Sequence, residues 1–197
     1  MKDTFLCIAS GPSLTKEQVE YCYGFREKIT TIVVNDNYIL APWADHLYAA
    51  DVTWWRHHLA KVNESFSGKK WIPNEEKFAK ENGLTLINCK YMEGLGKNGI
   101  LHCGHNSGYQ AINLAFQLGA EKIILIGYDF KVENPKMNHW FGQHGRGLRN
   151  ETKYEKWLKH FDKLKIDLDR EKVDVVNCSL DTNLNHFRKS KLEEELI

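Results

Sequence analysis

The chain of 197 residues contains no apolar run long enough to cross a bilayer, and its first apolar stretch is too short for a signal peptide. It also lacks an excess of charge of one sign, because 27 Lys and Arg are balanced by 26 Asp and Glu. Proteins that bind nucleic acids or membrane surfaces usually gather a basic excess on one face, so the charge implies neither partner. From these absences we expect a cytoplasmic protein without a membrane segment.

Cysteine is scarce as well, with five residues scattered along the chain and no Cys-x-x-Cys pair. Cys7, Cys89 and Cys178 lie in or beside apolar runs of strand length, which is typical of small buried thiols in a reducing compartment. No spacing of cysteines and histidines matches a standard zinc-ligand pattern. We therefore do not expect a structural zinc site.

What the chain does contain is an alternation of strand-like and helix-like segments. Apolar residues make up 42% and charged residues 27%, the balance of a folded globular protein. Short apolar or β-branched runs predict strands over residues 4–9, 30–35, 46–51, 70–73, 85–89, 122–126 and 173–178. Helices are expected after a capping box at Thr15 and Gln18, around Trp54 and Trp55, over 74–81, after Asn106 or Ser107, and along the stripe from Tyr154 to Leu168.

This alternation predicts right-handed βαβ crossovers and a single-domain, Rossmann-like three-layer α/β fold with a mostly parallel sheet. We expect a nucleotide-binding domain over residues 1–183 and a charged C-terminal tail over 184–197, either frayed or an exposed helix. Two long loops, residues 90–105 and 131–149, remain between the predicted elements. Loops of that length in compact domains tend to be functional.

Ligands of open α/β sheets bind beyond the carboxyl ends of the strands, so the residues that follow each predicted strand are the first candidates. The loop Ser10-Gly11-Pro12-Ser13 follows the first strand. In it, Gly11 would let a ligand approach the backbone, and Ser13 would donate to an anion at the start of a helix. We therefore predict that a nucleotide or another phosphate-bearing ligand sits on this loop. The same residue types are also common in plain strand-to-helix turns.

Other strand ends and one helix start offer further candidate contacts. Asn35 and Asp51 would suit a sugar or a base edge, and Asp129 would suit a ribose hydroxyl or a metal ion. Ser107 and Gly108 open a helix and form a second candidate anion site. Each residue has a structural alternative, because such polar residues often cap helices or end strands by bonding local backbone.

The two long loops carry histidines, at His102, His105, His139 and His144. A loop histidine titrates near neutral pH, which suits deprotonation of an acceptor hydroxyl. We place His144 ahead of His139 as general base, because it lies among glycines and two residues from Arg146, a residue suited to a departing phosphate. The loop over 131–149 is expected to become ordered over a bound ligand, as active-site lids do.

Several of these motifs together resemble the bacterial sialyltransferases that build lipooligosaccharide. The motifs are Gly11-Pro12-Ser13-Leu14, Asn35, Ser107-Gly108, the run from Leu118 to Phe130 with Gly127-Tyr128-Asp129-Phe130 at its end, and Asn177-Cys178-Ser179. The same skeleton is similar to the archaeal-type 6-hydroxymethylpterin pyrophosphokinase-like family, which includes many phage proteins. The resemblance spans nearly the whole chain in order.

The resemblance to the sialyltransferases implies that the Gly-Pro-Ser loop, Asn35 and Ser107-Gly108 hold the nucleotide of a CMP-sugar, with His144 or His139 as base. Asp51 stands where those enzymes have a second asparagine. This is closer to the pyrophosphokinase group, and Asp51 with Asp129 would suit Mg²⁺ and ATP.

We therefore expect a nucleotide-dependent transferase, with glycosyl transfer from a nucleotide-sugar ahead of Mg²⁺-ATP-dependent diphosphoryl transfer. A non-enzymatic nucleotide-binding module is the third alternative. The acceptor is expected to carry a hydroxyl group. Its identity, and whether the chain forms a homo-oligomer, stay open at this point.

Overall fold

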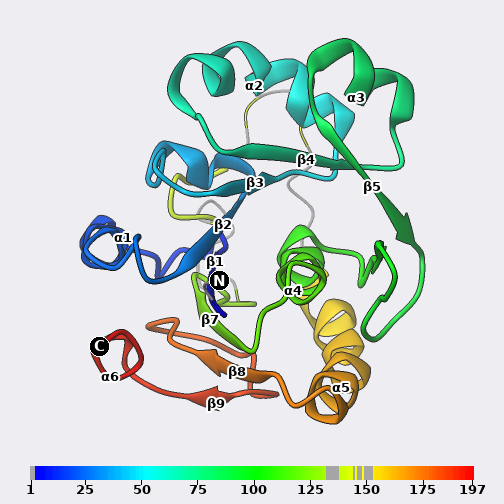
Figure 1. Ribbon diagram of the computed structural model, residues 1–197. Helices are drawn as coiled ribbons and strands as arrows, with labels where there is room; N and C mark the ends of the chain where they lie inside the picture. The colour runs from blue at the N-terminus through cyan, green and yellow to red at the C-terminus, as the bar shows by residue number, and fades with distance from the viewer. Residues whose placement is uncertain (1–2, 132–137, 144, 146–147, 149–152) are drawn as a thin grey trace.

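Nine parallel strands form one continuous sheet through the molecule (Figure 1). The computed structural model describes residues 3–131, 138–143, 145, 148 and 153–197. Within them the strand order is β6-β5-β4-β3-β2-β1-β7-β8-β9, and every neighbouring pair is parallel. Helices cover both faces of the sheet. The prediction of a single-domain, Rossmann-like three-layer α/β fold is therefore confirmed.

The predicted strands and helices are present, with boundaries close to those expected. The strands are β1 (Thr4–Ile8), β2 (Thr30–Val34), β3 (His46–Tyr48), β4 (Lys69–Pro73), β5 (Thr85–Lys90), β6 (Ile100–His102), β7 (Lys122–Ile126), β8 (Asp174–Asn177) and β9 (Arg188–Lys189). The helices are α1 (Lys16–Tyr23), the 3-10 helix η1 (Asn35–Ile39), α2 (Val52–Ser65), α3 (Glu76–Asn82), α4 (Ser107–Gln117), α5 (Tyr154–Arg170) and α6 (Leu192–Glu195). The capping box at Thr15 and Gln18 forms as predicted.

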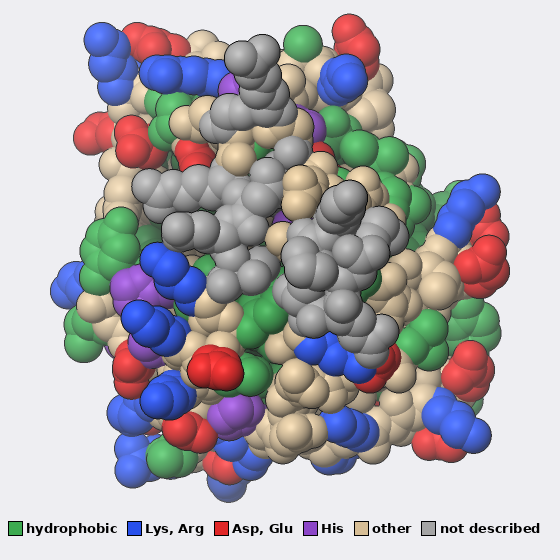
Figure 2. Space-filling model, turned by 180° about the vertical axis from the view of Figure 1, so that it is seen from behind, with side chains coloured by type: hydrophobic (Ala, Val, Ile, Leu, Met, Phe, Trp, Pro, Cys, Tyr) green, Lys and Arg blue, Asp and Glu red, His purple; other side chains and the backbone are tan. Residues whose placement is uncertain are grey.

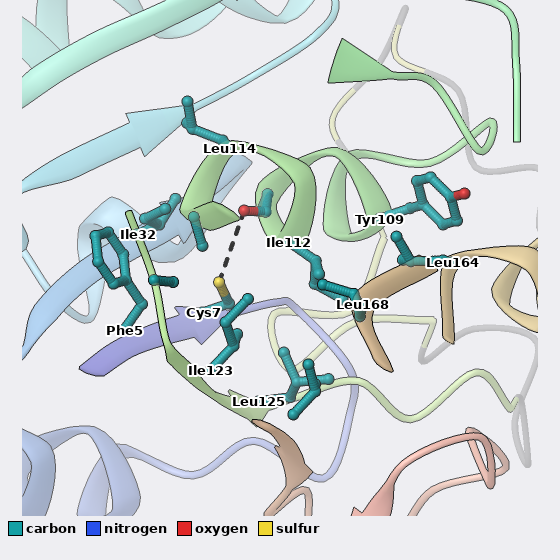
Figure 3. Close-up of a cluster of buried hydrophobic side chains, with 14 of the residues drawn as sticks. Phe5, Cys7, Ile32, Tyr109, Ile112, Leu114, Ile123, Leu125, Leu164 and Leu168 are labelled. Atoms are coloured by element: carbon teal, nitrogen blue, oxygen red, sulfur yellow. Dashed lines mark hydrogen bonds between the residues drawn. The ribbon is translucent and has the colours of Figure 1, made fainter. Parts of the chain in front are cut away.

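Alternate side chains of the central strands enter two separate apolar cores. Phe5 and Cys7 of β1 lie in the core beneath α4 and α5 (Figure 3), whereas Leu6 and Ile8 lie in the core beneath α1 and α2. Because both faces of the sheet are covered, the central strands are apolar on both sides, as buried parallel strands require. Their near-continuous apolar runs are what made them recognisable in the sequence.

The direction in which the sheet grows reverses between β1 and β7. From β1 the chain adds strands outward to β6, with α1, α2 and α3 on one face (Figure 1). It then returns through α4 on the other face and adds β7, β8 and β9 on the opposite side of β1. The loops that follow these two neighbouring strands run in opposite directions, so a crevice forms at the carboxyl ends of the strands. Open α/β sheets bind ligands in such a crevice.

The surface shows no concentration of one charge on the face seen in Figure 2, where acidic and basic side chains are interspersed. The five cysteines are free thiols, and Cys7, Cys22 and Cys178 are buried. In the described part of the chain, no helix combines the length and apolar character needed to span a membrane.

Two short strands, β6 and β9, were not predicted, and β6 lies in a predicted loop. The sequence predicts a loop over residues 90–105, but Ile100–His102 forms β6 and pairs with β5, with Leu101 beside Cys89. Three residues are too few to show a periodic pattern, and their pairing depends on β5 being in place. The strand brings the chain back to the carboxyl edge just before α4, where Asn106 rather than Ser107 accepts the capping hydrogen bond.

The expectation of a frayed or exposed C-terminal tail is wrong. Leu184, Phe187, Leu192 and Leu196 are buried, and the segment contributes β9 and α6 to the domain. These apolar residues form two short pairs, Leu184 with Phe187 and Leu192 with Leu196, separated by charged residues, which is too little to show a sustained period. Their burial follows from the cores that the rest of the chain has already formed.

An ion-pair cluster fixes this segment to the sheet. Arg188 donates to both Glu195, at 2.5 Å, and Asp174, at 2.8 Å, and Lys122 lies 2.9 Å from Glu195. Hydrogen bonds from Arg188, aided by Lys122, hold the pKa of Glu195 well below its ordinary value despite partial burial. The ionised form of Glu195 therefore stabilises the folded chain.

We expect Glu195→Gln to lower the free energy of unfolding at neutral pH by about 1 kcal/mol, because it removes an ion pair at the protein surface. A carboxylate whose pKa is lower in the folded than in the unfolded state stabilises the folded state at pH values above the unfolded-state pKa. This stabilisation is lost as the pH falls. The difference between the two proteins should therefore shrink below about pH 4, near the ordinary glutamate pKa. Denaturant unfolding at several pH values measures this difference in the free energy of unfolding. Glu193→Gln, an exposed position in the same helix, is the control and should have little effect.

Candidate functional site

A cavity of about 650 Å³ lies at the carboxyl ends of β1, β2 and β7, where the strand order reverses. The ends of these strands form one side, and the segment before α4 with the N-terminal half of α5 forms the other. Its lining residues are Ala9, Ser10, Gly11, Val34, Asn35, Asp51, Trp54, His105, Asn106, Ser107, Gly108, Gly127, Tyr128, Asp129, Phe130, Asn138, His139, Leu148, Lys153, Tyr154, Lys156, Trp157 and His160.

Most of the residues selected from the sequence meet at this cavity. Those that line it are Ser10, Gly11, Asn35, Asp51, Ser107, Gly108, Asp129 and His139. Pro12 and Ser13 are not among the lining residues. His144, the first candidate for the base, and Arg146 lie outside the described residues.

Ser13 is occupied by a protein carboxylate. Its backbone N–H donates to Asp129 Oδ2 at 2.6 Å, and its hydroxyl donates to Asp129 Oδ1 at 2.7 Å. The expectation that Ser13 offers donors to a ligand anion is therefore wrong, because Asp129 already takes both. Burial raises the pKa of Asp129 above its ordinary value, and the two hydrogen bonds from Ser13 oppose that rise.

Gly11 is required by the fold itself. Its N–H donates to Gly127 O at 2.8 Å, and a Cβ at this position would lie 2.6 Å from the same oxygen and overlap the Asp129 carboxyl group. The sequence predicts that a ligand approaches the backbone at Gly11. In the structure, the end of β7 fills that space.

His139 stands over the same loop. Ser10 Oγ lies 3.0 Å from His139 Nδ1, and the next residue, Trp140, donates its backbone N–H to Ser10 O at 3.1 Å. The Trp140 indole N–H also donates to Asn37 Oδ1 at 2.7 Å. Asn37 is fully buried and donates to Ile8 O at 3.0 Å. These bonds hold one imidazole at the cavity with its Nδ1 engaged.

The other side of the cavity carries three basic side chains that were not predicted from the sequence, beside His105, one of the loop histidines that were. Lys153, Lys156 and His160 of the α5 region line the cavity, and His105 faces them from the segment before α4, with its ring centroid 5.0 Å from that of His160. The signal was present, because spacings of three and four residues place side chains on one helical face. We had assigned this helix by its apolar stripe alone.

Aromatic rings complete the lining. Trp54, Tyr154 and Trp157 contribute flat surfaces suited to a base or a sugar ring. The orientation of the Trp54 side chain is fixed by two contacts. Its indole N–H donates to Asp36 at 3.0 Å, and its ring stacks on that of His58 with the centroids 4.4 Å apart.

The backbone is unusual along the same rim. Asn35, His105 and Phe130 have positive φ values of 52°, 59° and 49°. Asparagine accepts this left-handed conformation readily, but histidine and phenylalanine do so at a cost. Strained backbone of this kind concentrates at functional sites, where the surrounding fold maintains it.

The two carboxylates considered for Mg²⁺ have other partners. Asp51 caps α2 by accepting the Thr53 N–H at 2.7 Å, and both oxygens of Asp129 accept from Ser13. Among the described residues, no group of three or more His, Cys, Asp or Glu side chains has an arrangement that could hold a metal ion.

Comparison with known proteins gives a likeness among solved structures. No protein family model matches the chain, and no curated protein sequence matches it. Among solved structures it is similar to a MAf glycosyltransferase from Magnetospirillum magneticum AMB-1, with a TM-score of 0.66 and 16% sequence identity. The match covers 96% of this chain and 34% of that protein, so this chain spans about a third of its length. At this identity the likeness shows a shared fold.

The contacts of Gly11 lead to a test of stability. We expect Gly11→Ala to lower the free energy of unfolding by about 2 kcal/mol without any ligand, because the new methyl group overlaps packed atoms. Thermal or denaturant unfolding of the ligand-free protein measures it. Gly145→Ala is the control, since a Cβ there meets no atom within 4 Å. Equal stability of the two variants would contradict the close packing of the loop against Asp129.

Proposed function

We propose that the protein is a glycosyltransferase that takes a sugar from a nucleotide-sugar donor bound in the cavity between β1 and β7. The observation that carries the proposal is the placement of Ser10, Asn35, Ser107 and His139 around one cavity at the switch point of a parallel sheet. Open α/β sheets bind nucleotides at this position.

The cavity has the size and lining that such a donor needs. Its volume of about 650 Å³ lies within the range of ordinary ligand sites. Trp54, Tyr154 and Trp157 would contact the flat faces of base and sugar, and Asn35 and Asp51 would bond their polar edges. The lysines of the opposite wall suit a ligand that carries phosphate.

The comparisons support the same class of reaction. The chain shares its fold with a protein described as a glycosyltransferase, and its motifs resemble those of bacterial sialyltransferases. CMP-linked sugars are therefore the first donors to test. Asp51 and Asp129 are engaged elsewhere, which disfavours the alternative of diphosphoryl transfer from Mg²⁺-bound ATP.

His139 is the candidate base that the structure describes at the cavity. In the transfer, the acceptor oxygen forms a bond to the anomeric carbon while the bond from that carbon to the phosphate oxygen breaks. The acceptor proton passes to the imidazole, and the nucleotide leaves with its phosphate. Ser10 would keep His139 oriented through Nδ1, leaving Nε2 as the atom that accepts the proton.

Donor binding is the first test. A nucleotide-sugar that binds only the folded state should raise the melting temperature. We expect a rise with one of the CMP-, UDP- or GDP-sugars, unchanged when EDTA is added. A rise seen only with ATP and Mg²⁺ would favour diphosphoryl transfer. Binding of a nucleotide without turnover of any donor, by transfer or hydrolysis, would favour a binding module.

Substitution of His139 tests the chemistry. We expect His139→Gln to lower the turnover of the donor by about a hundredfold to ten-thousandfold, with nucleotide affinity nearly unchanged, because general-base assistance contributes about this much. The control is His57→Gln, an exposed histidine of α2 that does not line the cavity. Normal turnover in His139→Gln would clear this residue and leave His144 as the candidate to test next.

A further inference from the structure

The side of the cavity away from the strand ends carries a cluster of basic groups. We call it the α5 wall and define it as Lys153, Lys156 and His160 with His105 opposite. Lys156 and His160 are four residues apart and share a helical face. The His105 and His160 rings are close, with centroids 5.0 Å apart at an interplanar angle of 38°.

These groups are held in different ways. His160 is oriented by Glu93, whose Oε1 lies 2.6 Å from its Nδ1. The side-chain ammonium of Lys156 has no hydrogen-bond or ion-pair partner among the described residues, although the residue lines a cavity. A cation in that position is available to a ligand.

Glu93 pairs with His160 of this wall, and the two carboxylates that line the cavity have other hydrogen-bond partners. Asp129 lines the cavity from the end of β7 and is closed off by Ser13. Asp51 lies at the start of α2, beyond β3, and caps that helix. Among the described lining residues, the lysines come from the α5 region and Asp51 comes from the start of α2, whereas aromatic rings come from both, Trp54 from α2 and Tyr154 and Trp157 from α5.

We propose that the α5 wall binds the phosphate group of the ligand, in place of the loop Ser10–Ser13 to which the sequence argument assigned it. This inference rests on the proposed function, since it locates one part of the proposed donor. Lysine ammonium groups offer donors and charge to a phosphate mono- or diester, and the histidine rings offer N–H donors. The positive end of the α4 dipole at Ser107 and Gly108 adds to the same potential.

This placement has a chemical consequence. A departing nucleotide phosphate gains negative charge as its bond to the sugar breaks, and fixed cations nearby stabilise that charge. The α5 wall would supply this stabilisation from the protein alone. The polar residues around Asn35 and Trp54 are then left for the nucleoside or the sugar.

The test uses inorganic pyrophosphate as the probe, measured by calorimetry on the full chain in EDTA at low salt. We expect the wild-type protein to bind it. Lys156→Gln should weaken binding about tenfold, the loss of one charge-assisted contact, and Lys156→Gln with His160→Gln should weaken it further. Lys159→Gln is the matched control, because Lys159 is an exposed lysine of α5 outside the cavity, and it should stay within about twofold of wild type.

The outcomes separate this inference from the proposed function. Equal losses in Lys156→Gln and Lys159→Gln would show unspecific charge attraction and overturn the α5 wall, as would a wild-type protein that does not bind pyrophosphate. A nucleotide-sugar that binds all variants as tightly as wild type would overturn the wall while supporting the proposed function. Pyrophosphate binding that depends on Lys156, without binding of any nucleotide, would keep the wall and contradict the proposed function.

Discussion

The contact between Asp129 and Ser13 ties together the two strands at which the sheet changes direction. Asp129 follows β7, Ser13 precedes α1, and two hydrogen bonds of 2.6 and 2.7 Å join them. The carboxylate is buried, so these bonds must satisfy it in place of water. The approach is close enough that only glycine fits at position 11. A crevice between β1 and β7 keeps a defined shape because its two edges are joined in this way.

Other residues of the site are positioned by contacts with the loop that follows β1. Ser10, one residue before Gly11, contacts both His139 and Trp140, and Asn37 connects Trp140 to the end of β1. These contacts hold the segment with His139 and Trp140 against the loop that follows β1. The positive φ values at His105 and Phe130 show that the backbone around the cavity is kept in conformations that an isolated chain would avoid.

Charge divides the cavity into two regions with different chemistry. Near α2 the lining has asparagine, aspartate and tryptophan, and at α5 it has lysine and histidine together with Tyr154 and Trp157. Asp51 and Asp129 each already accept a hydrogen bond from the backbone. The charge of a phosphate-bearing ligand would be met by the lysines of the α5 wall. The proposed nucleotide-sugar donor would therefore bind with its phosphate at α5 and its nucleoside or sugar near α2.

Local pattern was enough to predict the layers of this fold and the edge at which ligands would bind. Apolar runs marked the central strands, the capping box marked α1, and the strand-end rule selected Ser10, Asn35 and Asp129, which all line the cavity. What those residues bond to was beyond a sequence argument, because Ser13 and Asp129 are 116 positions apart. The strands β6 and β9 were missed for the same reason, since segments of three and two residues gain their structure from neighbours already paired. Residue types and periodicity act over a few positions along the chain. The partner of a buried carboxylate, and the assembly of cations from α5 with His105, depend on which distant segments the folded sheet brings together.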